Sequence, residues 1–190
     1  MRATESVPMR LTGAVPEDQV IVEGSRFREM SIRVFAPLAH IGWSAAWLGT
    51  AAGAYSRVVT HIRSSEARGQ FDPSSELLLD RLARTRARLE TVHALLRHTV
   101  RVAASPAALE HRPAQALVNT LKAESADQCR LAVEELVEIV GLRHGYLPSS
   151  PLRLERAARD LRSAALNFHN DRLRRANGAL ALMDSGVRLV

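Results

Sequence analysis

Hydrophobic positions recur at helical spacing in four stretches of the chain and predict four amphipathic α-helices. The first helix is expected from near Pro37 to about Ala67, where Gly69 stops it. The second is expected from Asp72–Pro73, because a side-chain oxygen caps the first free amides and proline lacks the N–H that would need a partner. Spacings of three, four and seven place these residues of the second helix on one face: Leu78, Leu82, Leu89, Val92 and Leu96.

The second half of the chain predicts two more helices. The third follows Pro113 and ends near Gly141 and Gly145. The fourth starts at Pro151, weakens over 167–171, where poor helix formers cluster, and then resumes to about Met183. The expected inner positions of these two helices are Leu117, Leu121, Gln128, Ala132, Leu136 and Ile139, then Leu154, Ala158, Leu161, Ala165, Leu173, Leu180 and Met183, with Gln128 as a hydrogen-bonded core amide. Four helices with short links predict an all-α antiparallel four-helix bundle.

A short extended segment is expected before the helices. Residues 9–24 contain Gly13 and Pro16, followed by the alternation of Val20 and Val22, which is typical of one short strand. No partner strand is evident, and a lone strand is not stable by itself.

The run from Val34 to Tyr55 has no charged residue and approaches the length of a membrane span, about 20 residues. A helix that is apolar all round is equally expected at the centre of a bundle. Pro37, His40 and Ser44 lower the hydropathy of the run, so we favour the bundle and expect no membrane association.

The formal net charge of +6 and the pI near 10.8 raise the question of nucleic acid. Lys122 is the only lysine, and the arginines are scattered among acidic residues rather than collected in a block, so we expect no nucleic-acid role. The lone Cys129 lies in a helical pattern and predicts a buried thiol in a reducing cytoplasm. Residues 1–8 do not have the pattern of a signal peptide.

Familiar catalytic signatures do not occur in the sequence. It has no Gly-rich phosphate loop and no nucleophile elbow. His93 and His98 are five positions apart, which directs them to different sides of a helix, so no metal site is expected.

Three segments occur in an order that is typical of one enzyme family: MRLTG at 9–13 with VIV at 20–22, RGQF at 68–71 and ERAARD at 155–160. This order resembles that of the acyl-CoA dehydrogenases. Residues 9–13 (MRLTG) followed by 20–22 (VIV) are similar to the end of that family's middle β-domain. Residues 68–71 (RGQF) resemble its Arg-x-x-Phe segment, and residues 155–160 (ERAARD) resemble its Glu-Arg-x-x-Arg-Asp segment. Ser150 to Leu152 are closer still to the branch that includes flavin-dependent monooxygenases.

The resemblance implies a cofactor-binding role for Arg68, Gln70 and Phe71. In the family, the first two positions reach the pyrophosphate of FAD bound mainly by an adjacent subunit, and the Phe packs nearby. A helix-end guanidinium suits phosphate because it makes paired, charge-assisted bonds. Alternatively, Arg68 only complements the helix dipole above a Gly69 cap. Asp72 replaces a family glycine, and its carboxylate would repel a diphosphate.

Two further departures concern the chemistry. The family's Gly-Gly-x-Gly turn is replaced by residues 141–145 (GLRHG), and its catalytic Glu would stand at Phe168. We therefore expect no α,β-dehydrogenation by this chain alone. His169 and Asp171 are the candidate catalytic residues, because an imidazole titrates near neutral pH beside the expected site. The alternative is a solvent-facing histidine at a helix kink.

The resemblance divides the chain into residues 1–30, a remnant of a middle β-domain and linker, and residues 31–190, the helical bundle. We expect a truncated cytoplasmic subunit in a flavin-dependent oxidoreductase complex, either a homo-oligomer or a partner of a flavin-bearing subunit. FAD would be shared across the interface and bound weakly or not at all by the isolated chain, and the substrate would be a small molecule or acyl thioester. The alternative is a stand-alone bundle that binds a small molecule or performs non-redox chemistry.

Overall fold

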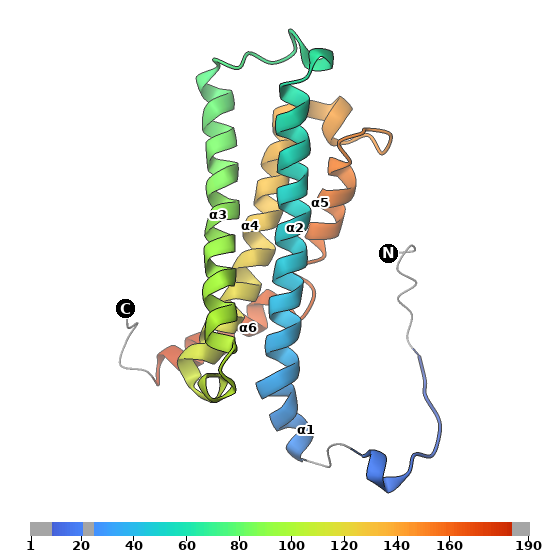
Figure 1. Ribbon diagram of the computed structural model, residues 1–190, viewed down its shortest axis with the longest axis vertical. Coiled ribbons are helices and arrows are strands. Elements are labelled where there is room, and N and C mark those ends of the chain that lie inside the picture. Colours follow the sequence, from blue (N-terminus) through green and yellow to red (C-terminus); the bar gives the residue numbers. More distant parts are fainter. Residues whose placement is uncertain (1–8, 21–24, 184–190) are drawn as a thin grey trace.

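The computed structural model describes residues 9–20 and 25–183, and throughout these ranges the regular structure is helical (Figure 1). The predicted all-α class is therefore confirmed. The only strand-like pairing among the described residues is an isolated bridge between Arg68 and Phe71. None of the described helices combines the length and the apolar character needed to cross a membrane.

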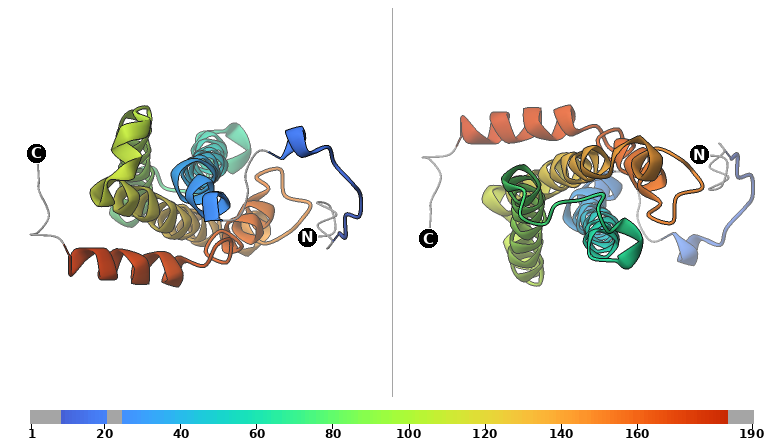
Figure 2. Two further views of the ribbon diagram at one scale, coloured as in Figure 1. Left: turned by 90° about the horizontal axis from the view of Figure 1, so that it is seen from below. Right: turned by 90° about the horizontal axis from the view of Figure 1, so that it is seen from above.

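Three long helices form the body of the molecule: α2 (Ala36–Ile62), α3 (Glu76–Ala103) and α4 (Arg112–Gly145). Helix α4 packs on α2 and α3, and also on the two shorter helices that follow it. Seen along the long axis, α3 lies on one side of the α2–α4 pair and α5 on the other (Figure 2). Helix α4 thus provides the central surface on which the other helices pack.

The predicted fourth helix consists of two separate helices. Helix α5 (Leu154–Arg162) packs against α2 and α4, whereas α6 (Asn170–Ala181) runs across α4 instead of continuing the line of α5 (Figure 2). The break expected over 167–171 is confirmed, and it takes the form of a turn over 163–169. Helix α6 ends before Met183, whose side chain is 66% exposed, so the expectation of an inner position there was wrong.

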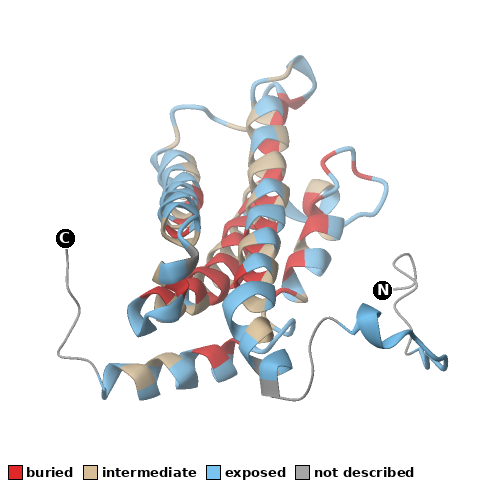
Figure 3. Cartoon of the chain, turned by 60° about the horizontal axis from the view of Figure 1, so that its bottom comes forward, coloured by how far each residue is buried: buried red, intermediate tan, exposed pale blue. Residues whose placement is uncertain are grey.

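About half of the predicted apolar positions belong to or pack against one continuous core between α2, α3, α4 and α5, and the buried residues of these helices face one another (Figure 3). Trp47, Ala51, Ala54 and Val58 contribute the α2 face of this core, which explains why the uncharged run is so rich in small residues. The members from the other helices include Leu89, Val92, Cys129, Ala132, Leu136, Leu154 and Leu161. The thiol of Cys129 is buried as predicted.

The first helix begins earlier than predicted. Helix α1 (Ser25–Met30) leads through a π-helical turn (Ser31–Phe35) directly into α2, so Pro37 lies within a continuing helix. A proline ring crowds the carbonyl four residues earlier and donates no hydrogen bond, and the wider π turn accommodates both effects. Val20 follows a 3₁₀ turn (Glu17–Gln19) and lies outside any strand, while Ile21 and Val22 lie outside the described residues.

The link between the first two long helices also differs from the prediction. Helix α2 ends at Ile62 rather than near Ala67, and a short 3₁₀ turn (Ser65–Ala67) precedes Gly69, whose φ is 81°. Asp72 does not cap α3, because its carboxylate accepts bonds from the N–H and hydroxyl of Ser74. Ser75 provides the cap instead, with its hydroxyl accepting from the N–H of Leu78 at 3.4 Å.

Helix α4 follows a 3₁₀ turn (Pro106–Glu110) and starts at Arg112, which places Pro113 in its first turn. It continues past Gly141, where φ is 70° and the helix is kinked. At Gly145, an added Cβ would lie 2.9 Å from the carbonyl oxygen of Val137, so a larger residue would not fit there. The predicted end near these two glycines is therefore confirmed, as a kink followed by a closely packed terminus.

Candidate functional site

The turn between α5 and α6 has an unusual backbone. Phe168 and His169 have φ values of 57° and 30°, although neither is glycine. Positive φ is uncommon for large side chains and persists where surrounding contacts impose it. The Phe168 ring meets the ring of His40 edge-on at 5.4 Å between centroids, and the Arg172 guanidinium lies 5.6 Å from the Phe168 centroid.

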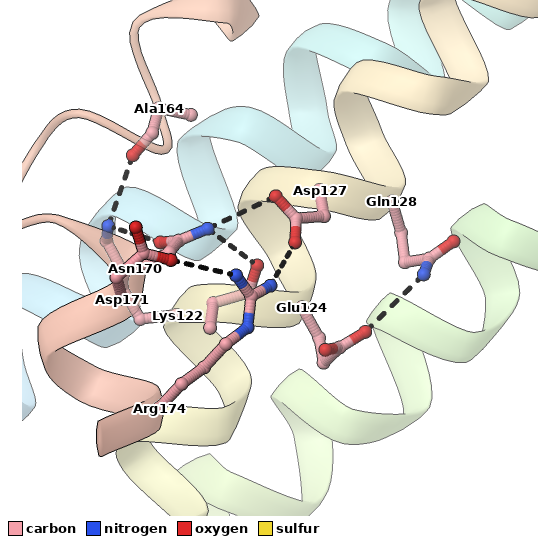
Figure 4. A network of polar contacts seen from close by, with 9 residues as sticks. Lys122, Glu124, Asp127, Gln128, Ala164, Asn170, Asp171 and Arg174 are labelled. Carbon is pink, nitrogen blue, oxygen red and sulfur yellow. Dashed lines mark hydrogen bonds and ion pairs between the residues drawn. The ribbon is translucent and has the colours of Figure 1, made fainter. Parts of the chain in front are cut away.

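Beneath this turn lies the only lysine of the chain. Lys122, on α4, is fully buried, and its Nζ donates to the carbonyl oxygen of Ala164 at 3.1 Å and to Oδ1 of Asn170 at 2.8 Å (Figure 4). The ammonium also lies 5.5 Å from the centroid of the Trp47 ring, a cation–π contact. Burial lowers the pKa of Lys122 to about 8, although the negative charge of Asp127 partly opposes the shift.

Asn170 and Asp127 extend this polar centre to the surface. The Nδ2 of Asn170 donates to the carbonyl oxygen of Ala123 at 3.3 Å and to Oδ1 of Asp127 at 3.2 Å. The other oxygen of Asp127 is bound by the guanidinium of Arg174 from α6 (Figure 4). The network therefore fastens the first residues of α6 to the middle of α4 by side-chain contacts.

His40, on α2, is the second buried titratable group of this centre. It is 2% exposed, and its Nδ1 has no hydrogen-bond partner among the described residues. Burial, reinforced by the positive charge of Lys122, lowers the pKa of His40 to about 4. Trp43 lies 5.9 Å from the His40 ring, so an aromatic cluster encloses a neutral imidazole beside a buried ammonium.

The two predicted catalytic residues lie on the outside of this centre. The side chain of His169 is exposed, and the Asp171 side chain is 99% exposed and 3.7 Å from Arg174. They are close in the chain but do not converge on a cavity among the described residues. Phe168, at the position expected for the family's base, covers the His40 ring instead of presenting a carboxylate.

Sequence reasoning missed the buried centre itself. Its signal was present, because Lys122 interrupts an apolar stripe in a chain whose other basic residues are arginines. Gln128 is hydrogen-bonded as predicted, accepting from Arg88 at 2.6 Å, but it is only half-buried. The pairs of the 155–160 segment are helix ion pairs, with Arg159 2.7 Å from Glu155 and Arg156 3.8 Å from Asp160.

The predicted cofactor residues gather at the other end of α2. Arg68 and Gln70 are exposed in the turn after α2, and Gln70 donates to the carbonyl oxygen of Glu66 at 3.1 Å. Phe71 is half-buried, with its ring 6.1 Å from the His61 ring. His40 and His61 are 21 residues apart on α2, which corresponds to about 30 Å along a helix. The turn that contains Arg68, Gln70 and Phe71 (the Arg68 turn) and the buried cluster around Lys122 and His40 (the Lys122 centre) are thus separate sites.

The residues of the Arg68 turn fit a diphosphate only in part. Arg68 offers a guanidinium that has no carboxylate oxygen within 4.0 Å among the described residues. The hydrogen bonds from Ser74 hold the pKa of Asp72 below its usual value, so this neighbouring carboxylate stays negative and opposes an anion. Beside the turn, the rings of His61 and His144 lie 4.5 Å apart, and His144 belongs to residues 141–145, which were expected to replace the family's glycine-rich turn.

The described residues form an all-α domain in which α4 packs on four other α-helices. The family model for the C-terminal domain of acyl-CoA dehydrogenase matches residues 38–168, which is more than half of the chain. The chain therefore belongs to the acyl-CoA dehydrogenase C-terminal domain family. No significant match was found among curated proteins or solved structures.

The matched region stops at Phe168. Helix α6 and its anchors Asn170 and Arg174 lie beyond it, as do His169 and Asp171. The contacts that bury Lys122 are thus made partly by a segment outside the family match.

Proposed function

We propose that this chain is a helical subunit of a flavin-dependent oxidoreductase complex and completes a shared site without acting as an independent α,β-dehydrogenase. The proposal rests on two features of the chain taken together: it keeps the family's Arg-x-x-Phe segment, and it lacks the family's catalytic Glu. The Arg68 turn keeps an exposed guanidinium for a partner's cofactor, whereas the family's base position is occupied by Phe168. Such a chain would contribute to cofactor binding through Arg68 but would provide no carboxylate at position 168.

The cofactor proposed for the complex is FAD, which would supply the redox chemistry when bound. Arg68 and Gln70 would contact its diphosphate, and the half-buried Phe71 would fix the turn against the bundle. The negative charge of Asp72 weakens this interaction in the isolated chain. We therefore expect stable FAD binding only when a flavin-bearing acyl-CoA dehydrogenase-like subunit encloses the rest of the cofactor.

Assembly is supported by exposed apolar side chains at the start of the long helix. Phe27, Val34, Phe35 and Leu38 are between 52% and 69% exposed. Apolar groups gathered on one helix end are typical of surfaces covered by a partner. The predicted oligomer, homomeric or mixed, would place this end in an interface, and a single monomer mass in light scattering across a wide dilution range would contradict it.

The test compares the chain alone with the chain co-expressed with a flavin-bearing acyl-CoA dehydrogenase-like subunit. Size-exclusion chromatography with absorbance near 450 nm should show a colourless chain alone and a yellow complex. Arg68→Ala should reduce flavin retention in the complex, whereas Arg63→Ala, an exposed arginine at the same end of α2, should not. Stoichiometric FAD retained by the isolated chain through desalting would contradict the shared-site proposal.

A second candidate function is small-molecule binding by a stand-alone bundle. The buried pair of Lys122 and His40 favours it. Among the residues that the structure describes, the Lys122 ammonium has no direct carboxylate partner and Nδ1 of His40 has no hydrogen-bond partner, so these polar groups lack full compensation inside the core. A folded, colourless chain that forms no complex with a flavin-bearing subunit would favour this candidate.

A further inference from the structure

A cleft between α2 and α5 concentrates positive charge away from both sites described above. Its volume is about 290 Å³, close to the lower end of the range for small-molecule sites, roughly 300–1,000 Å³. Three arginines line it, and Asp160 is the only acidic residue of the lining. The lining residues outside the charged set are Gly49, Thr50 and Ala157.

Two of the three arginines have no acidic partner. Neither Arg57 nor Arg153 has a carboxylate oxygen within 4.0 Å among the described residues, and Arg156 is 3.8 Å from Asp160. Many other arginines of the chain are paired more closely, such as Arg86 and Arg130. Guanidinium groups stay charged at all ordinary pH values, so the cleft keeps a net positive charge that an anion would neutralise.

The structure holds Arg57 in place at the cleft. Its Nε donates to the carbonyl oxygen of Leu152 at 2.8 Å, which joins α2 to the segment before α5. A Cβ at Gly53 would lie 3.3 Å from Nη1 of Arg57, so the absence of a side chain there leaves room for the guanidinium. A fixed guanidinium loses less freedom when it binds an anion than a mobile one does.

Arg153 is positioned by an uncommon backbone conformation. Its φ and ψ are 51° and 31°, in the left-handed region, and it directly precedes the first turn of α5. Its N–H donates to the carbonyl oxygen of Ser150, and its own carbonyl accepts from the N–H of Ala157, which fixes this conformation. The positive end of the α5 dipole adds to the charge of the three arginines.

We propose that this cleft, lined by Arg57, Arg153 and Arg156, binds the phosphate or diphosphate group of a small molecule. Planar guanidinium groups match phosphate oxygens through paired hydrogen bonds, and the hydroxyl of Thr50 borders the same space. Gly49 also lines the cleft, and an added Cβ there would meet no atom within 4 Å.

The lining glycine, Gly49, provides the first test. Gly49→Leu places a larger side chain at the lining of the cleft and should strongly weaken the binding of inorganic pyrophosphate in isothermal titration calorimetry with the full chain. Gly49→Ala should leave the affinity within about twofold, since a methyl group has room there. Both measurements use the chain without flavin or a partner, so failure of the shared-site proposal does not affect them.

The arginines are tested separately, which keeps the proposal falsifiable if Gly49→Leu fails to fold. Arg153→Gly removes one charge and relieves the positive φ, and Arg156→Gln removes another; each should weaken pyrophosphate binding about tenfold. Arg86→Gln, an exposed change of equal charge on α3, should not. The proposal would be overturned if pyrophosphate did not bind at millimolar concentration, or if Arg153→Gly, Arg156→Gln and Arg86→Gln lost affinity equally. Full affinity in a folded Gly49→Leu variant would overturn it as well.

Discussion

The Nζ atom of Lys122 lies 2.8 Å from Oδ1 of Asn170, a contact between the middle of α4 and the first residue of α6. The two residues are 48 positions apart, and Asn170 also reaches back to Asp127. The direction of α6 is therefore fixed by these polar contacts together with the buried Leu173.

Raising the pH should stabilise the fold through Lys122. Its pKa is about 8 in the folded chain and about 10.5 when unfolded, so the unfolded chain binds more protons between these values. The free energy of unfolding should rise as the pH increases from 8 toward 10.5. Urea unfolding at pH 7, 8 and 9 measures it, and Lys122→Met should remove the rise. An unchanged slope in that variant would mean that another group is responsible.

Cys129 should act in the opposite sense above pH 9. Burial raises the pKa of its thiol to about 12, whereas the unfolded thiol ionises near 9. The stability that the neutral thiol provides is present below pH 9 and is lost as the pH rises toward 12. Cys129→Ala should lower stability at neutral pH by about 1–2 kcal/mol but should remove the alkaline decline, so its curve should keep rising where the unmodified chain levels off.

Mild acid should destabilise the chain through His40. Its pKa is lowered to about 4, so the unfolded chain binds a proton first as the pH falls below about 6.5. Between pH 7 and 5 the loss should be roughly 1–2 kcal/mol, a value reduced for solvent screening. His40→Phe should flatten this acid branch, whereas the exposed His93→Asn should leave it intact. The reverse pattern would contradict the role of the buried imidazole.

His169→Ala should reduce turnover of an assembled complex without unfolding the chain. The side chain is exposed, and exposed substitutions change stability by about 0.5 kcal/mol or less. His169→Asn is the matched variant, because asparagine tolerates the positive φ at this position. Turnover equal to the unmodified complex would remove His169 from the site, and a large drop in melting temperature for both variants would assign it a structural role in the turn.

The helices were largely predictable because their apolar spacing decides which faces are buried. Leu89, Leu121 and Leu161 are buried, as the three- and four-residue spacing of apolar residues in each of their helices indicated. The start of the first helix was not predictable in the same way. Pro37 is favoured at a helix start, and nothing in the sequence signalled that a π turn would carry the helix back to Ser25.

The candidate site was predictable only in its outline. The segments around Arg68 and Phe168 follow from the order of family motifs. The contacts of Lys122 do not, because its partners lie 42 and 48 residues away and depend on a turn with positive φ at two non-glycine residues. Local sequence carries no signal for that backbone, so the burial of the lysine emerges only from the tertiary structure.

The burial of Lys122 also determines how the folded protein reacts with reagents that modify lysine side chains. Since the other 189 positions contain no lysine, acylating reagents and lysine-modifying enzymes find no lysine side chain on the surface of the folded chain. Acylation of Lys122 would require the turn over 163–169 or helix α6 to move away. The extent of Lys122 acylation, measured by mass spectrometry, therefore reports that motion without an engineered probe.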